Sequence, residues 1–267
     1  MNDIDQKSAN AIPGLRQWCV SCVELADELM VNTQCMENDH FGFMVLSFLS
    51  MQKTHMRSLL LLSETRDSCL IARSMIEGMC QLLWAADDPS ERGLRWRAYA
   101  WIIDWRTQRK NENAGEKVDP EIRMQIQTAL CEYREMFLTR KAIERKRTDG
   151  IFPDDPFVKT WSGHSISTII KFVSEEGLHN HLYSRFSDWL HWSPAGFSQS
   201  IERDDGRILY SSATSSETAT ALAVGFQSLV QILEVYARHF CEAESLRVSK
   251  LIADYIKWSQ PGAQPKT

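Results

Sequence analysis

Apolar residues recur at three- and four-residue steps along most of this 267-residue chain, and this spacing constrains its fold more than any other feature. The pattern is that of amphipathic helices, whereas the alternation typical of half-buried strands is nearly absent. One stretch carries Met44, Phe48, Met51, His55 and Leu59 on a single helical face. The sequence therefore predicts an all-α protein built as a multi-helix bundle.

Capping residues and helix breakers predict where the helices begin and end. Asp88 and Asp119 each precede a proline at the first helical position, and Thr214 with Glu217 forms a capping box. The segment over residues 66–86 is apolar almost all round, which is typical of the central helix of a bundle. The predicted helices span residues 13–31, 41–65, 66–86, 88–110, 119–147, 165–174, 178–191 and 214–244, with a last short helix ending at Trp258.

One segment departs from the helical pattern. A short β-hairpin insertion is expected near residues 197–210, where Asp205 and Gly206 offer a turn between two short apolar runs. Neither an internal repeat nor a composition shift marks a domain boundary along the chain. We therefore expect a single helical domain over residues 1–258 and a frayed C-terminal tail over residues 259–267.

The charge balance and the cysteines bear on partners and location. The 30 Lys+Arg and 35 Asp+Glu residues leave a net charge of -5, so no global basic field attracts nucleic acid, and no DNA partner is expected. Seven cysteines, scattered through apolar segments, predict reduced core thiols. The polar N-terminus does not resemble a secretory leader, and the longest apolar run, residues 41–51, is too short to cross a membrane. A soluble, cytoplasmic protein with no membrane partner is expected.

Arg73 and Glu77 are the first candidate site residues, because they lie four apart in a helix that the pattern predicts to be buried. At this spacing they share a helix face and can form a desolvated ion pair. Such a pair either ties the helix to its neighbours or forms the polar floor of a ligand pocket. The spacing alone does not choose between these two interpretations.

A second candidate combines Arg185, Ser187, Asp188 and His191 within one short predicted helix. A cation, a carboxylate and an imidazole so arranged could bind a phosphodiester and move a proton, with His191 as general base and Arg185 stabilising the developing negative charge. Six residues place Arg185 and His191 about 120° apart around a helix, so they would flank a cleft. The alternative is a hydrogen-bonded histidine that caps the helix beside two tryptophans.

A basic cluster ends the predicted helix over residues 119–147. Cations at a helix C-terminus are electrostatically favourable and usually solvated, which is the simpler interpretation. As a functional feature, the cluster is the best stretch of this chain for contact with an RNA backbone. Its members are Arg140, Lys141, Arg145, Lys146 and Arg147.

Metal and cofactor signatures are weak. Two Glu-x-x-His strings, residues 37–40 and 176–179, invite comparison with di-iron bundles, but both lie at polar or glycine-containing helix junctions. Cys19 and Cys22 form an isolated Cys-x-x-Cys without a second pair. Walker and dinucleotide-binding glycine motifs do not occur. We therefore expect neither a metal nor a cofactor.

Three separated pieces resemble a bacterial family known only as domain of unknown function 5677. They are Arg73 to Glu77 in a hydrophobic helix, Trp161-Ser162-Gly163 with the serine that follows, and Tyr183 leading to Ser187 and His191. The resemblance covers roughly residues 46–243. It implies a helical fold and a candidate ligand-binding pocket lined by Arg73, Glu77, Tyr183 and Trp161, but no reaction.

The spacing of Arg185 and His191 is also similar to the Arg-x(4 to 6)-His motif of the HEPN helical ribonucleases. That similarity implies metal-independent RNA cleavage in a toxin or antiphage role, with an active site formed in a homodimer. The sequence analysis thus favours a HEPN-like endoribonuclease with His191, Arg185, Ser187 and Asp188 at its site. The alternative is a non-catalytic helical module that binds a small ligand or a partner protein through a polar pocket.

Overall fold

The structure, a computed structural model, describes residues 3–31, 33–174, 182–190, 201–204, 207–210 and 214–260. Helices dominate these residues, so the predicted all-α, multi-helix class is confirmed. The chain divides into two compact units, which we name the bundle unit (Met1–Asp87 and Ile166–Thr267) and the inserted unit (Asp88–Ser165). The single domain predicted over residues 1–258 stays a prediction beside this division.

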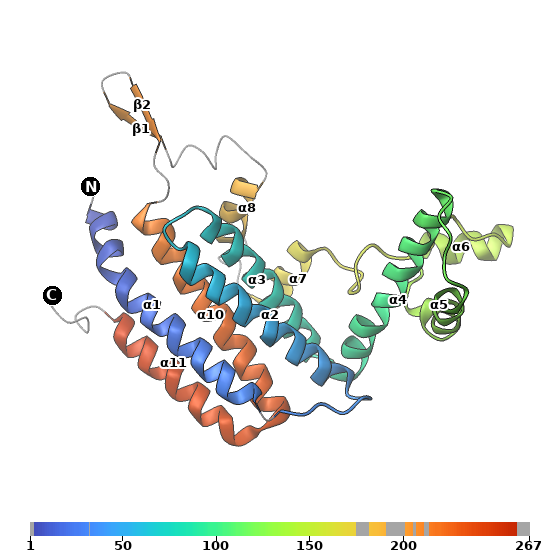
Figure 1. Cartoon of the computed structure of the whole chain (residues 1–267), viewed down its shortest axis with the longest axis horizontal. Helices are drawn as coiled ribbons and strands as arrows, with labels where there is room; N and C mark the ends of the chain where they lie inside the picture. The colour runs from blue at the N-terminus through green and yellow to red at the C-terminus, as the bar shows by residue number, and fades with distance from the viewer. Residues whose placement is uncertain are drawn as a thin grey trace. The chain divides into compact units, whose positions relative to one another are not determined.

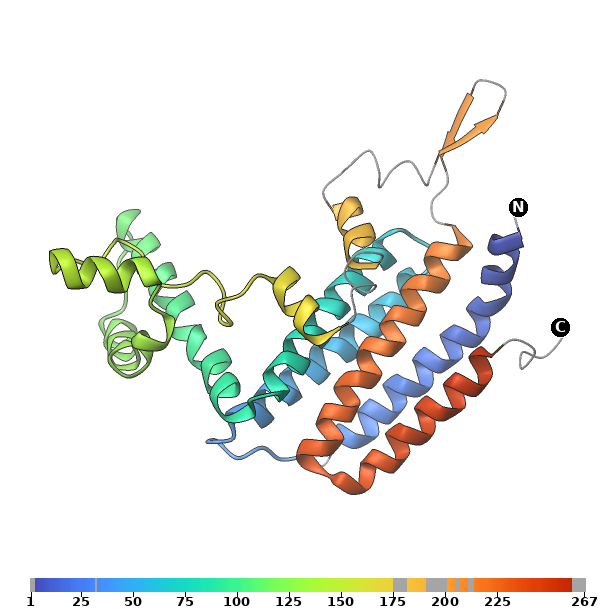
Figure 2. The ribbon, with the colours of Figure 1, turned by 180° about the vertical axis from the view of Figure 1, so that it is seen from behind.

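The long helices of the bundle unit run side by side (Figures 1 and 2). The central helix is α10, because it packs against α1, α2, α3 and α11, and not the segment over residues 66–86 that the apolar pattern favours. Gly225 on α10 permits close approach to α2, since a Cβ atom there would lie 2.5 Å from Leu59 Cδ2. These helices are α1 (Asp3–Met30), α2 (His40–Leu62), α3 (Asp67–Ala86), α10 (Ser215–Phe240) and α11 (Ser245–Ser259).

By length and composition, α10 would be apolar enough to cross a membrane. However, 67% of its most apolar window is buried against the other helices of the bundle unit. Its capping box is formed as predicted: Glu217 N donates to Thr214 Oγ1, and Thr214 N donates to Glu217 Oε2. The helix ends at Phe240 because Cys241 adopts an extended backbone, earlier than the predicted end at residue 244.

Shorter elements complete the bundle unit. Helices α7 (Ile166–Val173) and α8 (Ser184–Leu190) pack against α3, and Leu182 with Tyr183 forms a π-helical turn that leads into α8. A 3₁₀ turn, η3 (Glu242–Glu244), joins α10 to α11. Strands β1 (Ile201–Asp204) and β2 (Arg207–Tyr210) pair in antiparallel register, with Ile201 opposite Tyr210. Of the predicted tail, residues 261–267 lie outside the described part of the chain.

An aromatic cluster holds α11 against α1 and α10. The ring centroids of Trp18 and Tyr255 lie 5.9 Å apart in an edge-on arrangement, and those of Phe226 and Tyr255 lie 4.2 Å apart. Trp258 adds a further ring 6.3 Å from Trp18. Because each of these rings comes from a different turn or helix, the cluster fixes how α11 lies on the bundle.

The inserted unit contains α4 (Pro89–Asn113), α5 (Pro120–Tyr133), the 3₁₀ turn η1 (Arg134–Phe137) and α6 (Arg140–Asp149). The single helix predicted over residues 119–147 is therefore wrong, because the chain leaves α-helical geometry between Tyr133 and Arg140. Phe137 is fully buried there, and its carbonyl accepts from Val158 N at 2.8 Å. Thr139 then caps α6 by accepting from Ala142 N. Tertiary contacts with residues 156–158 outweigh the local helical pattern.

The cysteines divide between core and surface. All seven are free thiols, and Cys19, Cys22, Cys69 and Cys80 are buried. The prediction that the thiols all belong to the core is wrong for residues 131 and 241, which are exposed. Burial raises the pKa of the Cys19 thiol to about 12, so this thiol stays protonated at neutral pH.

Candidate functional site

Arg73, Glu77 and Tyr183, three of the four predicted ligand-binding residues, meet between α3 and the π-helical turn before α8. Arg73 Nη2 donates to Tyr183 Oη at 3.0 Å, and Tyr183 Oη donates to Glu77 Oε1 at 2.9 Å. The same Nη2 lies 3.1 Å from Glu77 Oε1, which closes a triangle of charge-assisted contacts. We call these three residues the α3–α8 site.

The burial of the α3–α8 site differs from one residue to the next. Tyr183 is buried, whereas the side chains of Arg73 and Glu77 are 15% and 31% exposed. Burial raises the pKa of the Tyr183 phenol, the Glu77 carboxylate adds to this rise, and Arg73 opposes it. The phenol is therefore protonated at neutral pH and serves as the donor to Glu77. Arg73 Nε is buried and has no hydrogen-bond partner among the described residues.

Helix α8 carries three of the four predicted catalytic residues. Ser187 Oγ donates to the Tyr183 carbonyl at 2.7 Å, so this hydroxyl is already engaged within its own helical turn. Arg185 and Asp188 are partly exposed on the same helix. Phe186 between them is 1% exposed, and its burial fixes how α8 lies in the bundle unit. His191 lies outside the described residues.

Arg185 lies within electrostatic reach of α3. Burial raises the pKa of the Cys69 thiol to about 12, Glu217 adds to this rise, and Arg185 and Arg66 oppose it. Cys69 lies on the same face of α3 as Arg73, because four residues separate them. Arg185 therefore adds a positive charge near the α3 surface that also carries the α3–α8 site.

Sequence reasoning did not identify Glu217 and Arg66 as neighbours of this surface. Glu217 was predicted only as a helix cap, yet its side chain is 2% exposed and its Oε1 has no hydrogen-bond partner among the described residues. The spacing of residues 66, 69, 73 and 77 places them on one face of a helix. That spacing is the sequence signal that would have found Arg66.

Trp161, the fourth predicted ligand-binding residue, belongs to the inserted unit. Its side chain is 8% exposed, and its carbonyl accepts from Arg95 Nε at 2.7 Å. Gly163 follows with a backbone φ of +74°, which favours glycine. In the inserted unit, Trp161 is thus part of a buried turn held by α4. Its role beside Arg73, Glu77 and Tyr183 stays a prediction.

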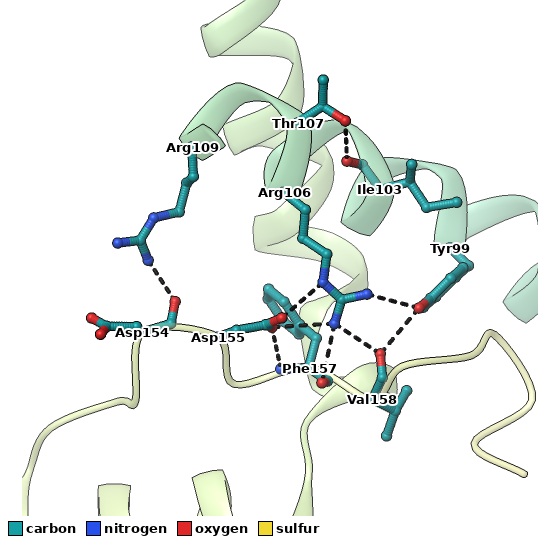
Figure 3. Close-up of polar contacts among 9 residues, drawn as sticks. All are labelled: Tyr99, Ile103, Arg106, Thr107, Arg109, Asp154, Asp155, Phe157 and Val158. Carbon is teal, nitrogen blue, oxygen red and sulfur yellow. Dashed lines mark hydrogen bonds and ion pairs between the residues drawn. The ribbon is translucent and has the colours of Figure 1, made fainter. Parts of the chain in front are cut away.

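Arg106 on α4 fastens the loop that follows α6, as Figure 3 shows. Its guanidinium donates to both carboxylate oxygens of Asp155, at 2.9 and 3.2 Å, and to the carbonyls of Phe157 and Val158. Its Nη1 donates to Tyr99 Oη at 2.9 Å, and that hydroxyl donates to the Val158 carbonyl at 3.1 Å. We call this group the α4 clamp. Its engagement on every side indicates a structural role.

The cations of α6 lie in surroundings that differ from those of Arg106 in the α4 clamp. All five predicted basic residues are exposed, and in the described part of the chain the side chains of four of them form neither an ion pair nor a hydrogen bond. These four, which we call the α6 cations, are Arg140, Lys141, Arg145 and Arg147. Lys146 is the exception, since its Nζ lies 3.8 Å from Glu135 Oε1 and 4.9 Å from the ring centroid of Phe152.

No three His, Cys, Asp or Glu side chains within the described residues come together in a way that would hold a metal ion. Of the two Glu-x-x-His strings, residues 37–40 lie at the start of α2. There Asp39 caps the helix by accepting from Gly42 N at 2.8 Å. Its other carboxylate oxygen lies 2.8 Å from His239 Nε2. The second string, residues 176–179, lies outside the described residues.

Comparison with known proteins bears on the family and not on the reaction. No curated protein and no solved structure matches the chain. The model of DUF5677, a family of unknown function, matches residues 51–208. This match covers more than half of the chain, and it includes the α3–α8 site and the whole inserted unit. The chain therefore belongs to DUF5677.

Proposed function

We propose that this protein is a metal-independent endoribonuclease that acts in the cytoplasm at the surface formed by α3 and α8. The observation that carries the proposal is that Tyr183, from the turn before α8, meets Arg73 and Glu77 of α3, with Arg185 near the same face of α3. Guanidinium groups beside a carboxylate and a hydroxyl provide the charges that phosphodiester cleavage needs.

In the proposed reaction, His191 accepts the proton of a ribose 2′-hydroxyl while that oxygen attacks the adjacent phosphorus. The bond from phosphorus to the 5′-oxygen breaks, and that oxygen takes up a proton from water, which leaves a 2′,3′-cyclic phosphate on one fragment and a 5′-hydroxyl on the other. Arg185 stabilises the negative charge that develops on the phosphoryl oxygens. Ser187 or Asp188 orients the imidazole. The HEPN similarity further implies a homodimeric enzyme with a toxin or antiphage role.

The α6 cations supply a surface for the RNA backbone. The inserted unit holds 15 Lys+Arg against 13 Asp+Glu, whereas the bundle unit holds 15 against 22. An acidic protein therefore concentrates half of its cations in its smaller unit. Exposed cations without protein partners can exchange counterions for phosphates without breaking any intramolecular pair.

The test is RNA cleavage by the purified full chain in the presence of EDTA. Wild type is expected to cut single-stranded RNA and leave cyclic phosphate ends, while Arg185→Ala and His191→Ala lose about a thousandfold in rate. Arg238→Ala is the matched control, because this exposed arginine on α10 donates only to the Glu234 carbonyl of its own helix. Intact RNA with wild type, or full activity in both site variants, rejects the proposal.

A second candidate function is ligand binding without catalysis. It is favoured because the polar groups of the α3–α8 site are engaged mainly with one another, and Ser187 already donates to a carbonyl. A protein of this kind leaves RNA intact in the assay above. It still binds a mononucleotide or inorganic phosphate in a thermal-shift measurement, and Arg73→Gln abolishes that shift.

A further inference from the structure

A cavity of about 490 Å³ lies between α10 and α11, and none of the proposed catalytic residues lines it. Its volume falls within the range of small-molecule pockets, roughly 300–1,000 Å³. The wall on the α10 side includes the buried residues Val224, Phe226 and Val230. Eleven residues line the cavity in all, and they include Leu182, Ala223, Gln227, Gln231, Ile252 and Tyr255.

None of these lining residues carries a charge at neutral pH. Tyr255 is the one titratable group, and burial raises the pKa of its phenol, so the ring stays neutral. The Tyr255 ring is also fixed against Phe226 and Trp18, which makes this wall of the cavity rigid. A charged group placed against this wall would lose part of its hydration without gaining a partner of opposite charge among the lining residues. The lining therefore selects a neutral ligand.

A polar strip on α10 gives the cavity hydrogen-bonding capacity. Thr220, Gln227 and Gln231 follow one another at seven- and four-residue spacing, so they lie on one face of the helix. Thr220 Oγ1 donates to the Ser216 carbonyl at 2.7 Å. The amides of Gln227 and Gln231 make no hydrogen bond within the described part of the chain. Each amide can both donate to and accept from a ligand.

The size of the cavity identifies the kind of occupant. Its eleven lining residues are about half of the 20–30 residues that each side of a stable protein interface provides. We propose that the α10–α11 cavity binds a small, uncharged and mainly apolar molecule that carries at least one amide-compatible hydrogen-bonding group. This inference is independent of RNA cleavage, because it rests on different residues.

Leu182 connects this cavity to the α3–α8 site within the same unit. Its side chain lines the cavity, and the next residue, Tyr183, contacts Arg73 and Glu77. A molecule bound in the cavity would therefore contact the turn that positions Tyr183. Ligand binding and the geometry of the α3–α8 site would then be coupled through two consecutive residues.

Two fluorescent probes with the same ring system test the charge selection. N-phenyl-1-naphthylamine is neutral, whereas 8-anilino-1-naphthalenesulfonate adds a sulfonate to the same rings. We expect the full chain to bind the neutral probe saturably, one molecule per chain, and at least about tenfold more tightly than the anionic one. Absence of saturable binding, or equal affinity for the two probes, overturns the proposal.

Matched substitutions locate the binding. Ala223→Phe places a ring inside the cavity and is expected to weaken the neutral probe by about tenfold or more. Ala253→Phe adds the same ring at an exposed position of α11 that does not line the cavity, and it retains binding. Ile252→Ala also changes the lining, but it enlarges the cavity, so this variant is expected to keep probe binding. The comparison separates filling of the cavity from a general effect of substitution in its lining. The site is rejected if Ala223→Phe and Ala253→Phe weaken probe binding equally. It is also rejected if self-association of the Ala223→Phe chain accounts for its lower affinity for the probe.

Discussion

Arg106 and the α6 cations belong to the same compact unit, yet their surroundings are opposite. Arg106 is 27% exposed and donates to a carboxylate, a hydroxyl and two carbonyls (Figure 3), whereas the α6 cations are exposed and make none of these contacts. An arginine whose three guanidinium nitrogens all donate contributes to stability, and removing it takes a donor away from several acceptors at once. An exposed cation without a partner contributes little to stability but is available to a polyanion.

The largest effect is expected from Arg106→Ala. The variant removes the guanidinium that donates to Asp155 and to the carbonyls of Phe157 and Val158, so the free energy of unfolding should fall by about 3 kcal/mol. Urea unfolding of the full chain measures this change. Arg109→Ala is the control. It removes one exposed hydrogen bond, to the Asp154 carbonyl, and a contact with the Trp105 ring, and it should cost under about 1 kcal/mol. Similar losses of stability in the two variants would show that the α4 clamp contributes no more than the single exposed hydrogen bond of Arg109.

Next in size is the effect of replacing the four α6 cations together with alanine. We expect single-stranded RNA to bind about 10- to 100-fold more weakly at low salt, with a salt dependence reduced by about 3 in the slope of log K against log[salt]. The free energy of unfolding should change by less than about 0.5 kcal/mol, because no pair in the described chain is lost. RNA affinity that is unchanged at every salt concentration would show that α6 is only a solvated helix end.

The smallest effect is expected from Lys146→Ala, which tests the case between these extremes. Its ammonium group lies 3.8 Å from an exposed carboxylate and 4.9 Å from the ring of Phe152. Exposed contacts of this kind contribute about 0.5 kcal/mol or less. Thermal unfolding of the single variant measures the loss. A loss near that of Arg106→Ala would mean that α6 is held to its unit by this residue.

Much of the fold could be predicted from local signals. Asp88, Asp119 and Thr214 accept hydrogen bonds from the first-turn backbone as capping residues do, so the starts of α4, α5 and α10 follow from the sequence. Other boundaries depend on tertiary contacts. Pro13 lies inside α1, which begins at Asp3, and the interruption before α6 exists because Phe137 pairs with residue 158. Neither the start of α1 ten residues before Pro13 nor the interruption before α6 has a signature in the neighbouring sequence.

The candidate site was predictable in part for similar reasons. The four-residue spacing of Arg73 and Glu77 requires that they share a face of α3, and the family resemblance added Tyr183 as their partner. The proximity of Glu217 to Cys69 depends on how α10 packs against α3, which spacing alone does not specify. The contrast between Arg106 and the α6 cations is likewise tertiary, since the partners of Arg106 lie about 50 residues away along the chain, in the loop that follows α6.

The central position of α10 has a consequence for synthesis of the chain. This helix lies near the C-terminus, yet α1, α2 and α3 all pack against it. Their apolar faces therefore stay uncovered on the ribosome until about residue 240 has emerged, while the contacts within residues 88–165 are already complete. A nascent chain that exposes such faces for so long is a natural client for chaperones. A stop codon introduced before residue 215 should yield an aggregating product and not a smaller bundle.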